Sequence, residues 1–327
     1  MTLDYNAVRY DRYRKGGHVE SYFFKLNDPA GRRALWLKAT ILARLEGRPV
    51  AEAWAIAFDR EREHVAVKEV TRHEFAEFSR RGLEVRVAGV HFSEGRLDGR
   101  IESPEHTIEF GLDFDTASPP LAPLPSRRLY EDWAPNTKLV SPHPNSRFSG
   151  SYSVDGGAPV AVEGWRGMQG HNWGSRHTER YAWTHVNQWD GDEEVVLEAF
   201  TGRVKVGPLL APPLTVVCVW HRGTRYEFNR PRELVRSRGR IGARSYRFEV
   251  ESALARASGE LHADTRDFVG LYYENPNREM TYCLNSKIAS GTLRLEPRGR
   301  PALELTTRAG ALELGTKDEH HGVSMLA

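Results

Sequence analysis

Apolar and polar residues alternate with a period of two along most of the chain, which is typical of β-strands that bury one face. Residues 83–87, 107–114 and 245–250 show this alternation most clearly. Only residues 71–80 favour a short helix, so the sequence predicts an all-β protein. Longer apolar runs predict further strands, several of them buried on both faces. These runs cover residues 35–45, 51–58, 214–220 and 280–289.

Prolines concentrate in residues 116–144, which include the runs SPPLAPLPS and SPHP. Because proline cannot donate a ladder hydrogen bond, we expect this segment to cross between sheets rather than join one. So many antiparallel strands close more readily into two barrels or sandwiches than into one. The sequence therefore predicts an N-terminal β-domain over residues 1–140 that ends in the Pro-rich linker, and a C-terminal β-domain over residues 141–327.

The charge balance gives no reason to expect a nucleic-acid partner, because 46 basic and 44 acidic residues are interspersed. Cys218 and Cys283 lie far apart in apolar runs and are predicted to be buried free thiols of a reducing cytoplasm. Residues 1–17 lack the apolar stretch of a signal peptide, and no apolar run is long enough to cross a membrane. We therefore expect a cytoplasmic protein without a transmembrane segment, with peripheral attachment to a membrane as the alternative.

Residues 163–190 concentrate chemistry-bearing side chains, with four of the eight tryptophans and three of the thirteen histidines. The tetrapeptide HNWG, residues 171–174, is followed by a predicted strand. An aromatic face interrupted by His and Asn is typical of an apolar cavity with polar handles, and equally of an aromatic core layer. On the cavity interpretation, the ligand-binding residues are Trp165, Asn172, Trp173, Tyr181, Trp183, His185 and Asn187.

The run GWRGMQGHNWG resembles the lipocalin-like superfamily that includes carotenoid 1,2-hydratase, tocopherol cyclase, AttH-like proteins and some fungal pericyclases. The upstream run NTKLVSPHPNSRFSGSYSVDG and the N-terminal run ESYFFKLNDPAGRRALWLKATILA support the same resemblance. It implies two tandem lipocalin-like antiparallel β-barrel or sandwich domains, with HNWG at the entrance to the second. The hydratase and pericyclase branches often carry an acidic residue before the motif histidine, whereas this chain has Gly170.

Reactions of that superfamily enclose a hydrophobic chain in a β-cavity, and some protonate an alkene with a buried acid. His171 matches the motif histidine and is one candidate catalytic residue. A buried carboxylic acid is better suited to protonating an alkene, and Gly170 cannot supply one. Glu198 is the second candidate, because it shares a predicted strand face with Val196 and Phe200. Such a carboxylate is either a cavity acid with a raised pKa or the partner of an arginine.

The histidines do not predict a metal site. His143, His171, His177 and His185 match no ligand spacing, and we expect neither a metal nor another cofactor. The resemblance therefore implies a cofactor-independent enzyme of the hydro-lyase, cyclase or isomerase type. Its partner would be a hydrophobic terpenoid-like molecule, such as a carotenoid or prenyl compound, or a polyketide-like one. The alternative is a non-catalytic carrier or binder of hydrophobic small molecules.

Overall fold

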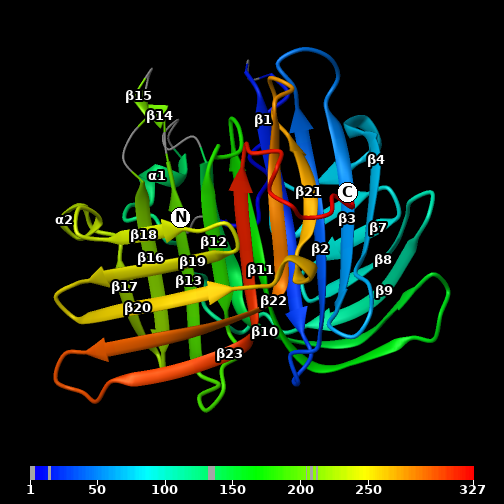
Figure 1. The fold of residues 1–327 in the computed structure, drawn as a ribbon. Coiled ribbons are helices and arrows are strands. Elements are labelled where there is room, and N and C mark those ends of the chain that lie inside the picture. The colour runs from blue at the N-terminus through cyan, green and yellow to red at the C-terminus, as the bar shows by residue number, and fades with distance from the viewer. Residues whose placement is uncertain (1–3, 14–15, 132–136, 204, 207–208, 211–212) are drawn as a thin grey trace.

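The computed structural model describes residues 4–13, 16–131, 137–203, 205–206, 209–210 and 213–327. Strands make up 60% of the structure and helices 5%, so the predicted all-β class is confirmed. Two large antiparallel sheets each curl into a half-barrel, which agrees with the predicted pair of lipocalin-like domains. Figure 1 shows β2, β3 and β7–β9 on one side of the molecule, β13, β16, β19 and β20 on the other, and β11 and β22 between them.

The first sheet has eleven strands in the order β4-β3-β2-β1-β11-β10-β9-β8-β7-β6-β5. Its strands are β1 (His18–Asn27), β2 (Arg33–Ala43), β3 (Val50–Asp59), β4 (Val65–Arg72), β5 (Glu77–Phe78), β6 (Glu84–Val87), β7 (Val90–Ser93), β8 (Arg96–Glu102), β9 (Thr107–Phe114), β10 (Thr137–Val154) and β11 (Val160–Gly174).

The second sheet has ten strands in the order β17-β16-β13-β12-β23-β22-β20-β19-β18, and β21 pairs with β22 beside this path. Its strands are β12 (Tyr181–Val186), β13 (Val195–Gly202), β16 (Leu214–His221), β17 (Thr224–Phe228), β18 (Arg238–Ile241), β19 (Ser245–Glu251), β20 (Ala255–His262), β21 (Val269–Glu274), β22 (Met280–Pro297) and β23 (Leu303–Thr316). The remaining elements are the pair β14 (Lys205–Val206) and β15 (Leu209–Leu210), the helices α1 (Arg128–Glu131) and α2 (Pro231–Leu234), and the 3₁₀ turns η1 (His73–Phe75) and η2 (Thr265–Asp267).

Sheet membership changes between Gly174 and Tyr181, because both β10 and β11 belong to the first sheet. The predicted division near residue 140 falls inside β10, and as a boundary between folding units it stays a prediction. The HNWG tetrapeptide forms the end of β11, where it pairs with β1. It therefore lies within the first sheet and does not begin the second.

The expectation that residues 116–144 avoid the sheets is wrong for their C-terminal part. The strand β10 includes Pro142 and Pro144 and pairs with both of its neighbours. Its pairing with β11 shifts register twice between Val140 and Ser146. The prolines lie in these bulges, where the regular ladder is already interrupted, so their missing N–H groups are tolerated.

The helix expected over residues 71–80 is not formed. The strand β4 continues to Arg72 because its backbone pairs with β3, and only the single turn η1 follows before β5. Residues 132–136, which belong to the Pro-rich segment, lie outside the described residues.

Alternation along β1 places its side chains in two different layers. Tyr22, Phe24 and Leu26 pack in the core of the first half-barrel, whereas Phe23 and Lys25 face the second sheet. We call the contact zone between the two sheets the inter-sheet layer. Its large aromatic side chains are Phe23, Trp36, Trp54 and Phe58 from the first sheet and Tyr181, Trp183 and Tyr273 from the second.

Gly170 is required by the packing of this layer. It lies opposite Phe23 in the pairing of β11 with β1, and the Phe23 ring covers it. A Cβ atom at residue 170 would lie 2.2 Å from Cζ of Phe23. The Phe23 ring packs edge-on against Trp183, with ring centroids 5.6 Å apart. An acidic side chain at residue 170 is therefore incompatible with this position of the phenylalanine.

We predict that Gly170→Ala lowers the free energy of unfolding by roughly 1–3 kcal/mol, because the buried Phe23 ring must move. Urea unfolding measures this change. Gly111→Ala is the matched control, since a Cβ atom there meets only the end of the Arg96 side chain at 3.4 Å. Equal stabilities of the two alanine variants would contradict the packing explanation.

Candidate functional site

A cavity of about 70 Å³ lies in the inter-sheet layer and is lined by side chains of both sheets. Typical ligand pockets have volumes of roughly 300–1,000 Å³, so this cavity has room for one end of a ligand but not for a long chain. Its walls are mainly aromatic. The lining residues are Phe23, Trp36, Lys38, Thr137, Leu139, Asn172, His177, Thr178, Tyr181, Trp183, Phe200, Tyr273 and Glu313.

The aromatic walls also carry an amide, an amine, an imidazole and a carboxylate, from Asn172, Lys38, His177 and Glu313. Asn172 Oδ1 is buried and has no hydrogen-bond partner among the described residues. Burial lowers the pKa of Lys38 to about 8 and that of His177 to about 3, so His177 is neutral at pH 7. Glu313 accepts a hydrogen bond from Nζ of Lys287 at 2.7 Å. The cavity thus combines an apolar wall with an orphaned acceptor, an amine and a carboxylate.

Glu198 lies one side chain away from this cavity. Its Oε1 atom accepts a hydrogen bond from Nε1 of Trp183 at 3.1 Å, and the Trp183 ring lines the cavity. Ser141 Oγ, on β10 of the other sheet, donates to the same carboxylate at 3.0 Å. These two groups, and no arginine of the described residues, are its hydrogen-bond partners. Burial raises the pKa of Glu198 to about 7.

His171 lies on the opposite face of the first sheet from Asn172, because neighbouring residues of a strand point to opposite sides. Its ring stacks on Tyr22, with centroids 4.1 Å apart, in the first half-barrel. Its Nδ1 atom lies 2.6 Å from the carbonyl oxygen of Tyr5, and its Nε2 atom lies 2.9 Å from Oε1 of Glu20. Both ring nitrogens therefore face oxygen acceptors within the protein.

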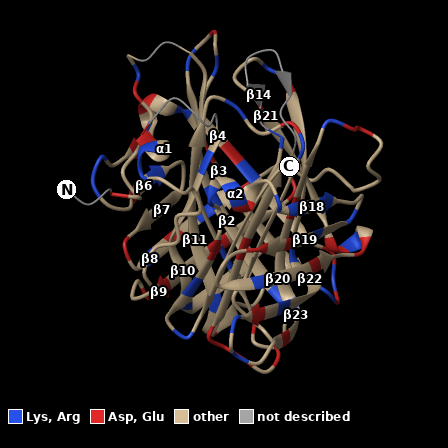
Figure 2. Ribbon diagram, turned by 90° about the vertical axis from the view of Figure 1, so that its left-hand side faces the viewer, with Lys and Arg blue, Asp and Glu red and all other residues tan. Residues whose placement is uncertain are grey.

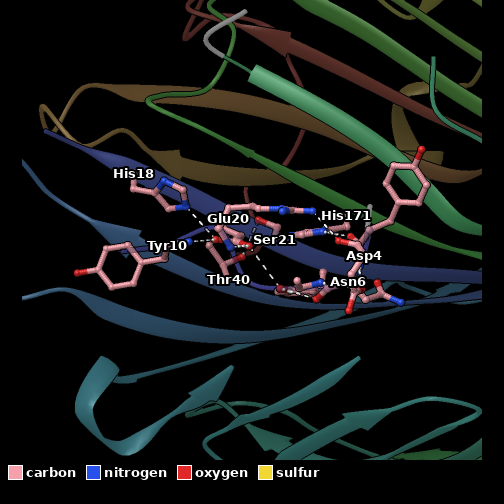
Figure 3. Close-up of polar contacts among 12 residues, drawn as sticks. Asp4, Asn6, Tyr10, His18, Glu20, Ser21, Thr40 and His171 are labelled. Atoms are coloured by element: carbon pink, nitrogen blue, oxygen red, sulfur yellow. Dashed lines mark hydrogen bonds and ion pairs between the residues drawn. The ribbon is translucent and has the colours of Figure 1, made fainter. Parts of the chain in front are cut away.

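Glu20 is the centre of this second, buried network (Figure 3). Its carboxylate accepts the backbone N–H groups of Arg9 and Tyr10 at 2.8 Å each, besides the imidazole N–H groups of His18 and His171. Burial by itself would raise the pKa of Glu20, but the hydrogen bonds from His171 and His18 outweigh it and hold the pKa at about 2. The network fastens the N-terminal segment to β1 and β11.

Of the seven predicted ligand-binding residues, Asn172, Tyr181 and Trp183 line the inter-sheet cavity. His185 and Asn187 face the same layer but are occupied. His185 Nε2 donates to the carbonyl oxygen of Pro144 at 2.9 Å, and Asn187 bonds to Lys25 and to the backbone of Gly167. The predicted row Tyr181–Asn187 is therefore buried against the first sheet, and half of it reaches the cavity.

The two remaining tryptophans lie elsewhere. Trp165 packs against Tyr152 in the first half-barrel and borders a separate, more polar cavity of about 930 Å³ at the end of that half-barrel. Trp173 lies beside His171, and its ring is covered by Tyr130 and by the guanidinium group of Arg9, 5.1 Å away. The structure thus divides the predicted site among three places.

Sequence reasoning missed Lys38, Tyr273 and Glu313 in the cavity and Glu20 beside His171. A signal existed for Lys38, because a single lysine interrupts the apolar run LWLKATI of a strand buried on both faces. No local signal existed for the pair of Glu20 and His171, which are 151 residues apart in the sequence.

The other predictions concern metal, thiols, charge and membranes. No group of three or more His, Cys, Asp or Glu among the described residues is arranged to hold a metal ion. Cys218 and Cys283 are free and buried, as expected. Basic and acidic residues are interspersed over the ribbon in Figure 2. Within the described part of the chain, no helix has the length and apolar character needed to span a membrane.

A solved structure has a fold similar to that of this chain. The crystal structure of a Nitrosomonas europaea protein described as a "putative AttH" superimposes with a TM-score of 0.58 and 15% sequence identity, over 91% of this chain and 92% of that one. The chain therefore has an AttH-like, lipocalin-like fold, which supports this part of the resemblance.

The sequence comparisons add relatives whose names state no activity. No protein-family model matches the chain. Two proteins of Mycobacterium tuberculosis, from strains CDC 1551 / Oshkosh and ATCC 25618 / H37Rv, are 26% identical over 304 residues, which is 92% of this chain and 87% of each relative. Both are described as uncharacterized proteins.

We predict that Glu20→Gln lowers the free energy of unfolding at pH 7 by about 3 kcal/mol, because a neutral amide replaces a buried carboxylate that accepts hydrogen bonds from two backbone N–H groups and two imidazole rings. The pKa of Glu20 is lower in the folded state, so its contribution is complete above pH 4.5 and is lost as the pH falls towards 2. The difference between variant and wild type, measured by urea unfolding, should shrink over that range. Glu84→Gln, at an exposed carboxylate that contacts His91, is the control, and an equal loss there would refute the prediction.

We predict the opposite pH dependence for Glu198→Gln. The pKa of Glu198 is raised in the folded state, so wild-type stability falls by about 3 kcal/mol as the pH rises from 4.5 to about 7. The glutamine carries no such penalty, and its amide can still pair with Trp183 and Ser141. Melting temperatures should show the variant close to wild type at pH 5 and more stable at pH 8. Glu227→Gln, on the exposed face of β17, should show no such crossover.

Proposed function

We propose that this protein is a cofactor-independent hydratase, cyclase or isomerase of a hydrophobic molecule, terpenoid-like or polyketide-like, whose polar end enters the inter-sheet cavity. One observation carries the proposal. The cavity joins an aromatic wall to polar groups that the fold leaves unused, namely the orphaned Oδ1 atom of Asn172 and the amine of Lys38. Such a combination orients a ligand that is apolar except at one end.

The aromatic wall is also suited to a cationic intermediate. Trp36, Trp54 and Tyr273 already surround an ammonium group, with Nζ of Lys38 3.8 Å from the Tyr273 centroid. The attraction between a cation and a ring face is worth about 2 kcal/mol when both are desolvated. A carbocation formed from a protonated alkene would meet the same ring faces.

Glu198 is the proposed acid, because burial keeps a large fraction of it protonated near neutral pH and it bonds to Trp183 of the cavity wall. Since its carboxyl group does not line the cavity, a bridging water would have to carry its proton to the substrate. His171 fits a different role. Both of its nitrogens are bound within the protein and its ring lies in the first half-barrel, so we propose that it positions β11 rather than the substrate.

A carrier of hydrophobic molecules is the second candidate. The observation in its favour is that neither His171 nor Glu198 lines the cavity. Binding alone needs the apolar wall and the polar handle. A labelling experiment separates the two functions. The molecule that co-purifies with the protein is extracted and then incubated with the protein in deuterium oxide. An enzyme that protonates an alkene places deuterium on carbon, and a carrier returns the molecule unlabelled.

We predict that farnesol, a prenyl alcohol, quenches the tryptophan fluorescence saturably, and that Leu139→Trp weakens its binding at least tenfold by filling the cavity. The matched control is Leu254→Trp, whose side chain is 60% exposed and far from the lining residues. The control should bind as wild type does. Equal binding by both variants, or the absence of any hydrophobic ligand from native mass spectra and of any farnesol binding, would contradict the proposed site.

A further inference from the structure

We propose that Lys38 is an amine nucleophile that forms an imine with the carbonyl group of a hydrophobic aldehyde or ketone bound in the inter-sheet cavity. The inference rests on the proposed function, because it concerns the same cavity. It adds a substrate class and a covalent step to that function.

The position of Lys38 is set by the strand that carries it. It lies in the middle of β2, opposite Phe23 of β1 and Trp54 of β3, and it shares the inter-sheet face with Trp36. Only 4% of its surface is exposed, yet the side chain lines the cavity. A ligand in the cavity would therefore contact the amine away from bulk solvent.

Lys38 differs from the two other lysines of this layer. Nζ of Lys25 donates to the amide oxygens of Asn187 and Asn27, at 2.9 and 3.2 Å. Nζ of Lys287 bonds to Glu313. The Lys38 amine has no hydrogen bond or ion pair to a described residue and contacts ring faces instead, with the Tyr273 centroid 3.8 Å away. Its lone pair, once the proton is lost, is not engaged.

Burial also supplies the amine in its reactive form, since it lowers the pKa of Lys38 to about 8 and outweighs the surrounding charges. A desolvated lysine of this kind is a recognised nucleophile towards carbonyl groups. The titratable groups around it are Glu52 of β3, Lys68 of β4, Tyr273 of β21, Cys283 of β22, Glu313 of β23 and His177 of the loop before β12.

The covalent step balances without a cofactor. The amine lone pair attacks the carbonyl carbon, a C–N bond forms, and the carbonyl π electrons move to oxygen. A proton passes from nitrogen to that oxygen and gives a carbinolamine. The remaining N–H proton is then carried to the hydroxyl group, water leaves, and the neutral imine results. Glu313 lines the same cavity and is the carboxylate available to carry these protons. The aromatic walls limit the bulk water that would reverse the step.

Reductive alkylation tests the proposal on the intact wild-type protein. The protein is incubated at pH 7.5 with propanal and sodium cyanoborohydride, and alkylated lysines are mapped by peptide mass spectrometry. A lysine with a pKa of about 8 has roughly a hundredfold more free amine at this pH than an ordinary one. We expect propyl groups at Lys38 at least tenfold faster than at Lys317, which is partly exposed, with a rate at Lys38 that reaches half its maximum near pH 8.

Two variants check the assignment. Lys38→Arg keeps the positive charge but cannot form an imine, and it should abolish the fast alkylation. Lys317→Arg is the matched control and should leave it unchanged. Propanal is small enough for the cavity, so labelling at Lys38 no faster than at Lys317 would overturn the proposal. An ammonium that serves only as an anion anchor would give this negative result.

Octanal and nonane, which have equal numbers of heavy atoms, distinguish this inference from the proposed function. If octanal and nonane both displace farnesol but octanal is not trapped at Lys38, the nucleophile is ruled out and the hydrophobic site stands. If propanal alkylates Lys38 rapidly but octanal, nonane and farnesol do not bind, the hydrophobic site is ruled out and the nucleophile stands. Trapping of octanal at Lys38 with displacement by nonane is the outcome expected here.

Discussion

The packing of the two sheets against each other is constrained by lysine ammonium groups that are buried between them. Lys25, Lys38 and Lys287 all lie in the inter-sheet layer, and removing an ammonium group from water costs several kcal/mol unless other groups compensate. Amide oxygens compensate at Lys25, a carboxylate at Lys287, and aromatic faces at Lys38. The Lys25–Asn187 and Lys38–Tyr273 contacts join the first sheet to residues of the second half-barrel, whereas the Lys287–Glu313 pair lies within the second sheet. The cavity lies beside Lys38, whose ammonium group is compensated by ring faces alone.

The fold could be predicted because period-two alternation is a local property of the strands that bury one face. The strands over residues 107–114 and 245–251 confirm it. What local pattern could not supply was the sheet that each face meets. His171 and Asn172 are neighbours in the sequence, yet one faces the first half-barrel and the other faces the cavity. The candidate site was therefore only partly predictable, since Trp183 was found and Lys38 was not.

The HNWG tetrapeptide contributes to two places at once. Its histidine and tryptophan belong to the network around Glu20, and its asparagine belongs to the cavity wall. The glycine before it admits the Phe23 ring into the inter-sheet layer. A motif of this kind couples the attachment of the N-terminal segment to the shape of the inter-sheet cavity, although no single residue does both.

The pairing of β1 with β11 has a consequence for synthesis on the ribosome. One edge of β1 pairs with β2, which follows it immediately in the chain. The other edge pairs with β11, which ends at Gly174. At about 5–20 residues per second, that edge remains without its partner for roughly 10–30 s. An unpaired apolar strand edge is a template for pairing with other chains. The nascent first half-barrel is thus an open sheet for most of its synthesis, and its closure awaits a segment far along the chain.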